Sequence, residues 1–97
     1  MKRIKIHDLK TWPEPFEAVL VGMKVAEYRK NDRKFQIGQY LNLREWSPVT
    51  QDYTGRTLLV RITHIVYGGQ FMIPSDYCVM SITAEPFMKP TSDSKSE

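Results

Sequence analysis

The sequence has little cysteine and no long apolar segment. Cys78 is the only cysteine in 97 residues, so the chain has no internal disulfide and no cluster of thiolates for a metal. No apolar run approaches the roughly 18 residues that a membrane-spanning helix needs. The basic N-terminus is not followed by the apolar region of a secretory signal. These absences predict a cytoplasmic protein without a membrane segment.

Motifs of common enzyme classes are also missing. The chain contains no Ser-His-Asp order, no phosphate-binding loop and no dinucleotide fingerprint. The two histidines, His7 and His64, stand far apart and lack the spacing of metal ligands. We therefore expect no metal and no other cofactor. Lys and Arg exceed Asp and Glu by 14 to 11, and this net charge of +3 permits a polyanionic partner without requiring one.

Hydrophobic periodicity predicts a single small α+β domain that is mostly β. Pro13 opens a helical pattern that continues to Val21, with Phe16 and Val19 on one face and Gly22 as the C-terminal cap. Strand patterns follow at short spacing, and one helix cannot serve a parallel βαβ array. We expect a small, mostly antiparallel β-barrel of five to six strands with one main N-terminal helix. The predicted strands lie at about 4–9, 24–29, 40–46, 56–67 and 77–82.

The strand patterns also predict which side chains face the core. Ile4 and Ile6 form the apolar face of the first strand, and His64 extends the apolar face of the strand at 56–67 as a core or edge histidine. Residues 1–84 are expected to form the domain. Residues 85–97 carry prolines, serines and mixed charge, which predicts a flexible tail.

The most charged part of the chain runs from Gly22 to Gly38. Seven of its seventeen residues are Lys, Arg, Asp or Glu, and both signs of charge are present. On an extended strand Glu27 and Arg29 share one face, predicted to point outward, where they would form a salt bridge or line a pocket. Four cations within six residues would suit a phosphate backbone. The alternative is a solvated hairpin with screened ion pairs. The four are Arg29, Lys30, Arg33 and Lys34.

Tryptophans flank two of the loops. Trp12 and Trp46 would stack on unpaired bases if they are exposed beside cations, or close the ends of the barrel if they are buried.

A longer pattern resembles a known family. The pattern H-x-L-K-T-W-P, then G-x-K, E-x-R-x-N-D-R, F and G, resembles the small bacterial and phage domains of the DUF3850 family. That family is placed in the ASCH superfamily, which is similar to PUA domains. The resemblance implies a PUA-like β-barrel that binds RNA in a cleft beside the helix through the G-x-K-x-x-E-x-R segment. The residues concerned are 7–13, Phe16, Val19, 22–24, Glu27, Arg29, 31–33, Phe35, Gly38 and Leu41.

We therefore expect an RNA- or nucleotide-binding module, monomeric by default. Lys10, Arg29 and Arg33 would hold phosphate, Glu27 would accept a hydrogen bond from a base edge or orient Arg29, and Trp12 would stack or wall the pocket. The predicted ligand-binding residues are Lys10, Trp12, Lys24, Glu27, Arg29, Asn31 and Arg33.

Two other functions remain open. One is a small hydrolase acting on RNA or a modified nucleoside, with Lys24, Glu27 and His7 as candidate catalytic residues. Superfamily amidohydrolases that act on N4-acetylcytidine use a lysine, a threonine three residues on, and a later glutamate. Lys24 matches the lysine, Glu27 replaces the threonine, and residues 68–76 offer Asp76 but no glutamate. The other is an accessory protein that binds another protein or a small acidic metabolite.

Overall fold

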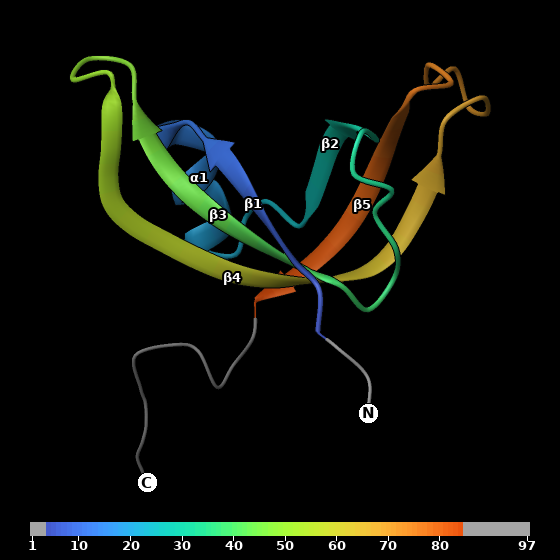
Figure 1. Cartoon of the computed structure of the whole chain (residues 1–97), viewed down its shortest axis with the longest axis horizontal. Coiled ribbons are helices and arrows are strands. Elements are labelled where there is room, and N and C mark those ends of the chain that lie inside the picture. The colour runs from blue at the N-terminus through green and yellow to red at the C-terminus, as the bar shows by residue number, and fades with distance from the viewer. Residues whose placement is uncertain (1–3, 85–97) are drawn as a thin grey trace, which may run out of the picture.

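The computed structural model describes residues 4–84 and contains one helix and one five-stranded sheet (Figure 1). The elements are β1 (Ile6–Thr11), α1 (Pro13–Leu20), β2 (Ala26–Lys30), β3 (Tyr40–Ser47), β4 (Asp52–Tyr67) and β5 (Tyr77–Ala84). The order across the sheet is β1-β3-β4-β5-β2. Strand β1 runs parallel to β3, and all other neighbouring strands are antiparallel. The tail predicted at 85–97 lies outside the described residues.

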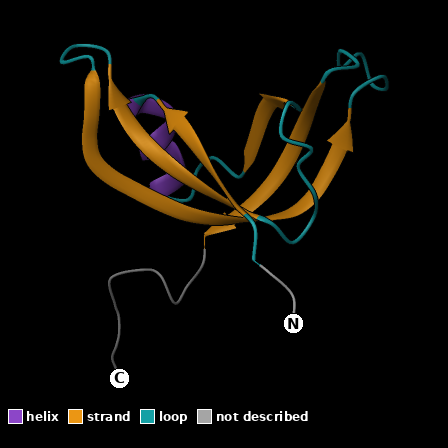
Figure 2. Cartoon of the chain, viewed as in Figure 1, coloured by secondary structure: helices purple, strands orange, loops and turns teal. Residues whose placement is uncertain are grey.

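The sheet curls into a half-barrel, and the long strand β4 follows the whole curve (Figures 1 and 2). Strands β1 and β2 are the two ends of the sheet, and the curl turns them toward one another. The predicted class, a small and mostly antiparallel β fold with five or so strands and one main helix, is confirmed. Several boundaries differ from the prediction by two or more residues. Strand β1 is shifted to Ile6–Thr11, β2 begins at Ala26, β4 already begins at Asp52, and β5 continues to Ala84.

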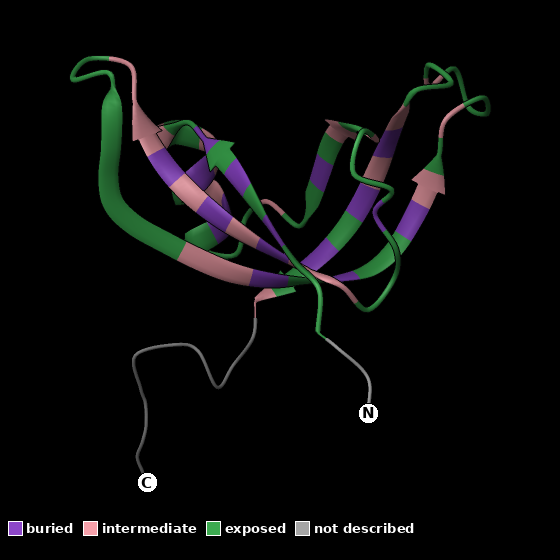
Figure 3. Cartoon of the chain, viewed as in Figure 1, coloured by how far each residue is buried: buried purple, intermediate pink, exposed green. Residues whose placement is uncertain are grey.

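The core lies on the inner face of the curled sheet. Alternate residues of each strand point inward, and Figure 3 shows the resulting bands of buried and exposed positions. Helix α1 contributes Phe16 and Val19 to this core. The buried apolar residues are Leu9, Phe16, Val19, Phe35, Leu41, Leu43, Val60, Ile62, Ile65, Cys78, Met80 and Ile82.

Helix α1 begins and ends where local signals place it. Pro13 occupies the first turn, and Trp12 is the N-cap residue. The predicted glycine cap is confirmed, since Gly22 has φ +82° and its amide donates to the Val19 carbonyl at 3.0 Å. The Met23 amide donates to the Ala18 carbonyl at 2.9 Å, which completes a Schellman motif. This turn reverses the chain and leads directly into the segment before β2.

Strand β1 faces the opposite way from the prediction. Ile4 and Ile6 are exposed, whereas His7, Leu9 and Thr11 point inward. The reason is the pairing with β3, where His7 lies beside the inward Leu41, and neighbouring residues across a sheet share a face. The buried His7 ring has a hydrogen-bond partner, because its Nε2 bonds the Gln39 side-chain oxygen at 2.8 Å.

Strand β4 contains an irregularity that the pattern did not reveal. The register with β5 shifts between Ile62 and His64, so one residue is inserted and the alternation changes phase. Ile65 is consequently buried and His64 is exposed. The prediction that His64 extends the apolar face was therefore wrong.

A candidate ligand cleft between the two ends of the sheet

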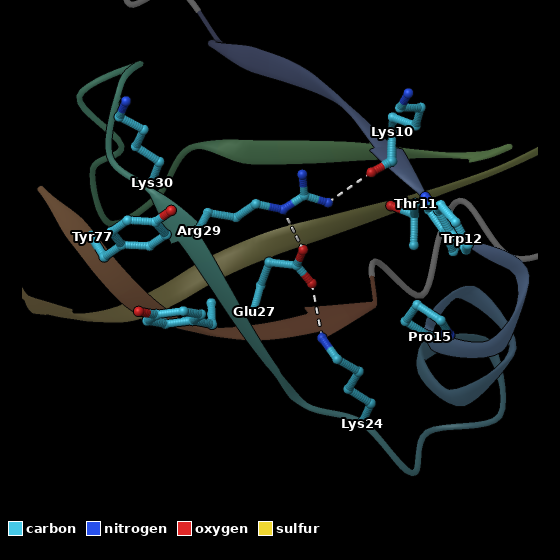
Figure 4. A pocket seen from close by; sticks show the side chains of 10 residues that line it. Lys10, Thr11, Trp12, Pro15, Lys24, Glu27, Arg29, Lys30 and Tyr77 are labelled. Atoms are coloured by element: carbon cyan, nitrogen blue, oxygen red, sulfur yellow. Dashed lines mark hydrogen bonds and ion pairs between the residues drawn. The ribbon is translucent and has the colours of Figure 1, made fainter. Parts of the chain in front are cut away.

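A cleft of roughly 540 Å³ opens between β1, the start of α1, and β2 (Figure 4). The curl of the sheet creates it by bringing the two end strands toward each other without joining them in a ladder. Five of the seven predicted ligand-binding residues line this cleft. The lining consists of Lys10, Thr11, Trp12, Pro15, Lys24, Glu27, Tyr28, Arg29, Lys30 and Tyr77.

A buried carboxylate stands at the centre of the cleft. The Glu27 side chain is only 7% exposed, and each of its oxygens accepts from a different cation. Lys24 Nζ lies 2.9 Å from Oε1, and Arg29 Nε lies 2.6 Å from Oε2. The predicted pairing of Glu27 with Arg29 is confirmed, but the outward direction was wrong, because this face of β2 turns into the half-barrel. Two cations on one buried carboxylate leave a net positive charge there.

Arginine side chains connect the two ends of the sheet. Arg29 Nη2 donates to the Lys10 backbone carbonyl of β1 at 2.9 Å, and Arg33 Nη1 donates to the Asp8 carbonyl. Both carbonyls belong to an end strand. The guanidinium of Arg29 therefore bonds the Glu27 carboxylate and the far wall at once, which holds its planar group across the cleft.

Aromatic rings and a lysine form the β1 wall. Trp12 is 53% exposed, and its ring centroid lies 6.0 Å from that of the half-buried Trp46. Lys10 Nζ sits 4.3 Å above the centre of the Trp46 ring. The alternative that Trp12 is buried and closes an end of the barrel is therefore wrong, because about half of this residue is exposed to solvent. The β1 wall therefore presents the exposed face of Trp12 and the exposed ammonium group of Lys10.

The opposite rim was predicted only in part, because Lys30 belonged to the predicted cation cluster but Tyr28 and Tyr77 were missing. Tyr28 and Lys30 alternate with Glu27 and Arg29 along β2, so the pattern placed them away from the charged face. They line the cleft because it extends around the free side of β2. Tyr77 reaches the same rim from β5, where it pairs with Lys30, and only the long-range strand pairing reveals that.

Three predicted site residues do not line the cleft. His7 lies in the core against Gln39 and the Phe35 ring, with 4.8 Å between ring centroids. The Asn31 side-chain oxygen accepts from the Phe35 amide at 3.0 Å and so stabilises the turn after β2. Arg33 holds the β1 backbone. Each therefore has a structural partner outside the cleft lining.

A second buried carboxylate fixes the helix that walls the cleft. Arg56 donates to both oxygens of Glu45, with Nε at 2.9 Å and Nη2 at 3.1 Å, and Thr54 donates a further hydrogen bond at 2.8 Å. Arg56 Nη2 also bonds Glu17 of α1 at 3.1 Å, and the guanidinium lies 4.9 Å from the centre of the Phe16 ring. This cluster ties α1 to β3 and β4.

Acid is expected to weaken this cluster. The hydrogen bonds from Arg56, and then from Thr54, lower the pKa of Glu45 below its usual value of 4.5. The unfolded chain then binds more protons than the native chain in acid, so the stabilisation is complete above the unfolded pKa and is lost as the pH falls through the native one. We expect Glu45→Gln to be less stable than the wild type at neutral pH, with a difference that narrows below about pH 4.5.

Thermal unfolding followed by circular dichroism between neutral pH and about pH 3 measures this difference. Asp32→Asn is the matched control, because Asp32 is an exposed carboxylate in a turn that asparagine suits equally. If the difference in melting temperature between Glu45→Gln and the wild type is the same at every pH, the ionised Glu45 carboxylate does not contribute this stability.

Other chemistry is not apparent among the described residues. Within 4–84, His, Cys, Asp and Glu form no group of three or more that could hold a metal ion. No helix in the same range is long and apolar enough to cross a membrane. Cys78 is buried in β5, and burial raises the pKa of its thiol. A raised pKa disfavours the reactive thiolate.

Comparison with known proteins identifies the family of this cleft-bearing fold. The sequence model of the family described as "Domain of unknown function (DUF3850)" matches residues 6–82. The chain belongs to the DUF3850 family. The matched residues run from the first residue of β1 into β5, so β1 to β4, α1 and most of β5 lie within the DUF3850 region.

A phage protein is similar to this DUF3850 chain. It is the "Uncharacterized 12.9 kDa protein in GpA 3'region" of Escherichia phage P2, which is 44% identical over 61 residues. The aligned part covers 63% of this chain and 54% of the phage protein, so the match spans about half the length of that relative.

Proposed function

We propose that this DUF3850 domain is an ASCH/PUA-like module that binds RNA or a nucleotide-like ligand in the cleft between β1, α1 and β2. The observation that carries the proposal is the composition of the cleft. Four cations and a single carboxylate line it, and the carboxylate is already paired with two of them. The cations are Lys10, Lys24, Arg29 and Lys30.

The geometry suggests a role for each wall. Lys10 and Lys30 stand on opposite rims and are exposed, so both can approach phosphates. The half-exposed Trp12 ring offers a face for a nucleobase, and a base–aromatic stack tolerates any sequence. A carboxylate has about four acceptor positions, so Glu27 can accept from a base amino group while keeping Lys24 and Arg29.

The same features support the superfamily assignment as part of the proposal. A mostly β half-barrel with one short helix has the architecture that the ASCH and PUA-like resemblance implies. The cleft lies beside that helix, and Lys24, Glu27 and Arg29 of the G-x-K-x-x-E-x-R segment face into it. Fold analogy alone does not establish function, so the proposal depends on the charge and aromatic lining.

Salt dependence of binding tests the proposal. We expect labelled single-stranded RNA to bind in fluorescence anisotropy, with an affinity that falls about 20-fold between 50 and 200 mM salt if about three phosphates are contacted. Lys10→Ala should reduce the slope by roughly 0.7. Arg61→Ala removes the same charge from an exposed position of β4 outside the cleft lining and should leave the slope unchanged. The proposal would be refuted if the affinity did not change with salt concentration, or if Lys10→Ala and Arg61→Ala gave equal slopes of affinity against salt concentration.

A second candidate is a hydrolase of RNA or a modified nucleoside. It is favoured by the contact between Lys24 Nζ and Glu27 Oε1, which places a cationic donor against a carboxylate in a cleft. His7 does not fit a catalytic role here, since its ring is buried against Gln39. A nucleoside panel assayed with wild type and Lys24→Ala decides the matter, because turnover that is absent or unaffected by the substitution removes this candidate.

A further inference from the structure

The cleft does not stop at β2 but continues around it. Glu27 and Arg29 lie on the inner face of this strand, while Tyr28 and Lys30 lie on the opposite face, yet all four line the same opening. The register with β5 confirms the two faces, because Glu27 and Arg29 pair with the buried Met80 and Cys78. Strand β2 is the last in the sheet order, so no strand within residues 4–84 pairs with its outer side.

An aromatic platform occupies the outer face of β2. The Tyr28 and Tyr77 rings are stacked, with 5.0 Å between centroids and 19° between planes. Tyr28 is 54% exposed, and Lys30, the strand neighbour of Tyr77, is exposed beside the pair. Figure 4 shows Arg29 extending toward β1 on one side of β2 and Tyr77 on the other.

The two aromatic surfaces therefore lie on opposite sides of the charged centre. Trp12 stands on the β1 wall, and the Tyr28–Tyr77 pair stands beyond β2. A single base cannot contact both, because β2 itself lies between them. A chain of at least two nucleotides can place one base on each surface while its backbone passes the cations at the rim.

We propose that the ligand is a single-stranded oligonucleotide which crosses the free edge of β2 and stacks a second base on Tyr28 and Tyr77. This inference rests on the proposed function and narrows its ligand class. A duplex does not fit, because its bases stay stacked on one another and cannot stack on aromatic side chains of the protein. A free mononucleotide would leave the tyrosine platform unused.

A length series tests the inference. Wild-type protein is titrated with uridine monophosphate, a labelled uridine dinucleotide and a labelled uridine hexanucleotide. We expect the affinity to rise about 5- to 150-fold from the mononucleotide to the longer ligands, the range that one base–aromatic stack supplies. Tyr28→Ala should remove most of this gain with length, whereas Tyr28→Phe should retain it.

Matched controls separate binding from stability. Tyr53→Ala removes a comparably exposed tyrosine from β4, outside the cleft lining, and should behave as wild type. A purely structural Tyr28–Tyr77 pair, which would only support the β2–β5 pairing, predicts that Tyr28→Ala weakens all ligand lengths equally. The split between mononucleotide and oligonucleotide affinity distinguishes the two roles.

The possible failures are also distinct. Oligonucleotides that bind no better than the mononucleotide, a Tyr28→Ala variant that keeps the length effect or weakens every length equally, or duplex that binds as well as single strand would overturn this inference alone. The cleft would then bind a single nucleotide or the terminal nucleotide of an RNA strand. Absence of binding at every length would overturn both this inference and the proposed function.

Discussion

An Arg29→Ala variant is expected to bind single-stranded RNA about 10- to 100-fold more weakly than the wild type. Arg29 bonds both walls of the cleft, through Glu27 and through the Lys10 carbonyl. Its removal takes a cation from the phosphate path and leaves the buried Glu27 with Lys24 alone. A hydrogen bond to a charged group contributes about 1.5–3 kcal/mol, and about 1.4 kcal/mol corresponds to tenfold in affinity.

The Arg29→Lys variant sharpens this prediction. Lysine keeps the charge but lacks the planar guanidinium that reaches Glu27 and β1 together. We expect an affinity between those of the wild type and Arg29→Ala, measured by anisotropy on samples whose folding is verified by circular dichroism. Arg61→Ala again removes a positive charge outside the cleft. If Arg29→Ala binds as tightly as Arg61→Ala, Arg29 is not part of the binding site.

Local signals in the sequence predicted the elements that depend on local structure. Pro13 at the first turn and Gly22 after the last turn set the limits of α1, and both effects act within a few residues. The contact of Glu27 with Arg29 followed from strand alternation, since residues two apart share a face. The centre of the candidate site was therefore predictable from the stretch that contains it.

Features set by distant strands were not predictable in this way. The apolar Ile4 and Ile6 are exposed because pairing with β3 turns His7 and Leu9 inward. The displacement of His64 comes from an irregularity in the β4–β5 register, and no local residue pattern announces it. A one-residue change in register reverses every side chain of a strand, so these errors share one physical cause.

The far walls of the cleft were hidden for a related reason. Nothing in the charged stretch indicates that Arg29 and Arg33 bond backbone carbonyls of β1, which lie 19 and 25 residues earlier in the chain. Tyr77 joins the rim only through pairing of β5 with β2. Arg33 was predicted to hold phosphate because cations at a turn suggest it, but the curl of the sheet brings a carbonyl to this guanidinium.

The largest loss of stability is expected from Phe16→Ala. Phe16 is 1% exposed and inserts α1 into the sheet core, with the Arg56 guanidinium over its ring. Truncation of a buried phenylalanine costs about 3–5 kcal/mol, through lost burial and a residual cavity. A small domain has roughly 5–15 kcal/mol in total, so this variant should lose much of its stability. Urea denaturation followed by circular dichroism measures the change.

Phe71→Ala provides the matched control, because it removes the same atoms from a side chain that is 81% exposed. Its effect should stay within about 0.5 kcal/mol. Phe16 lies one turn beyond Trp12 and next to Pro15, so loosening α1 should also disturb the wall of the cleft. We therefore expect Phe16→Ala to weaken RNA binding at temperatures where it is still folded, and Phe71→Ala to leave it unchanged. Equal urea midpoints for the two variants would show that burial of Phe16 does not stabilise the domain.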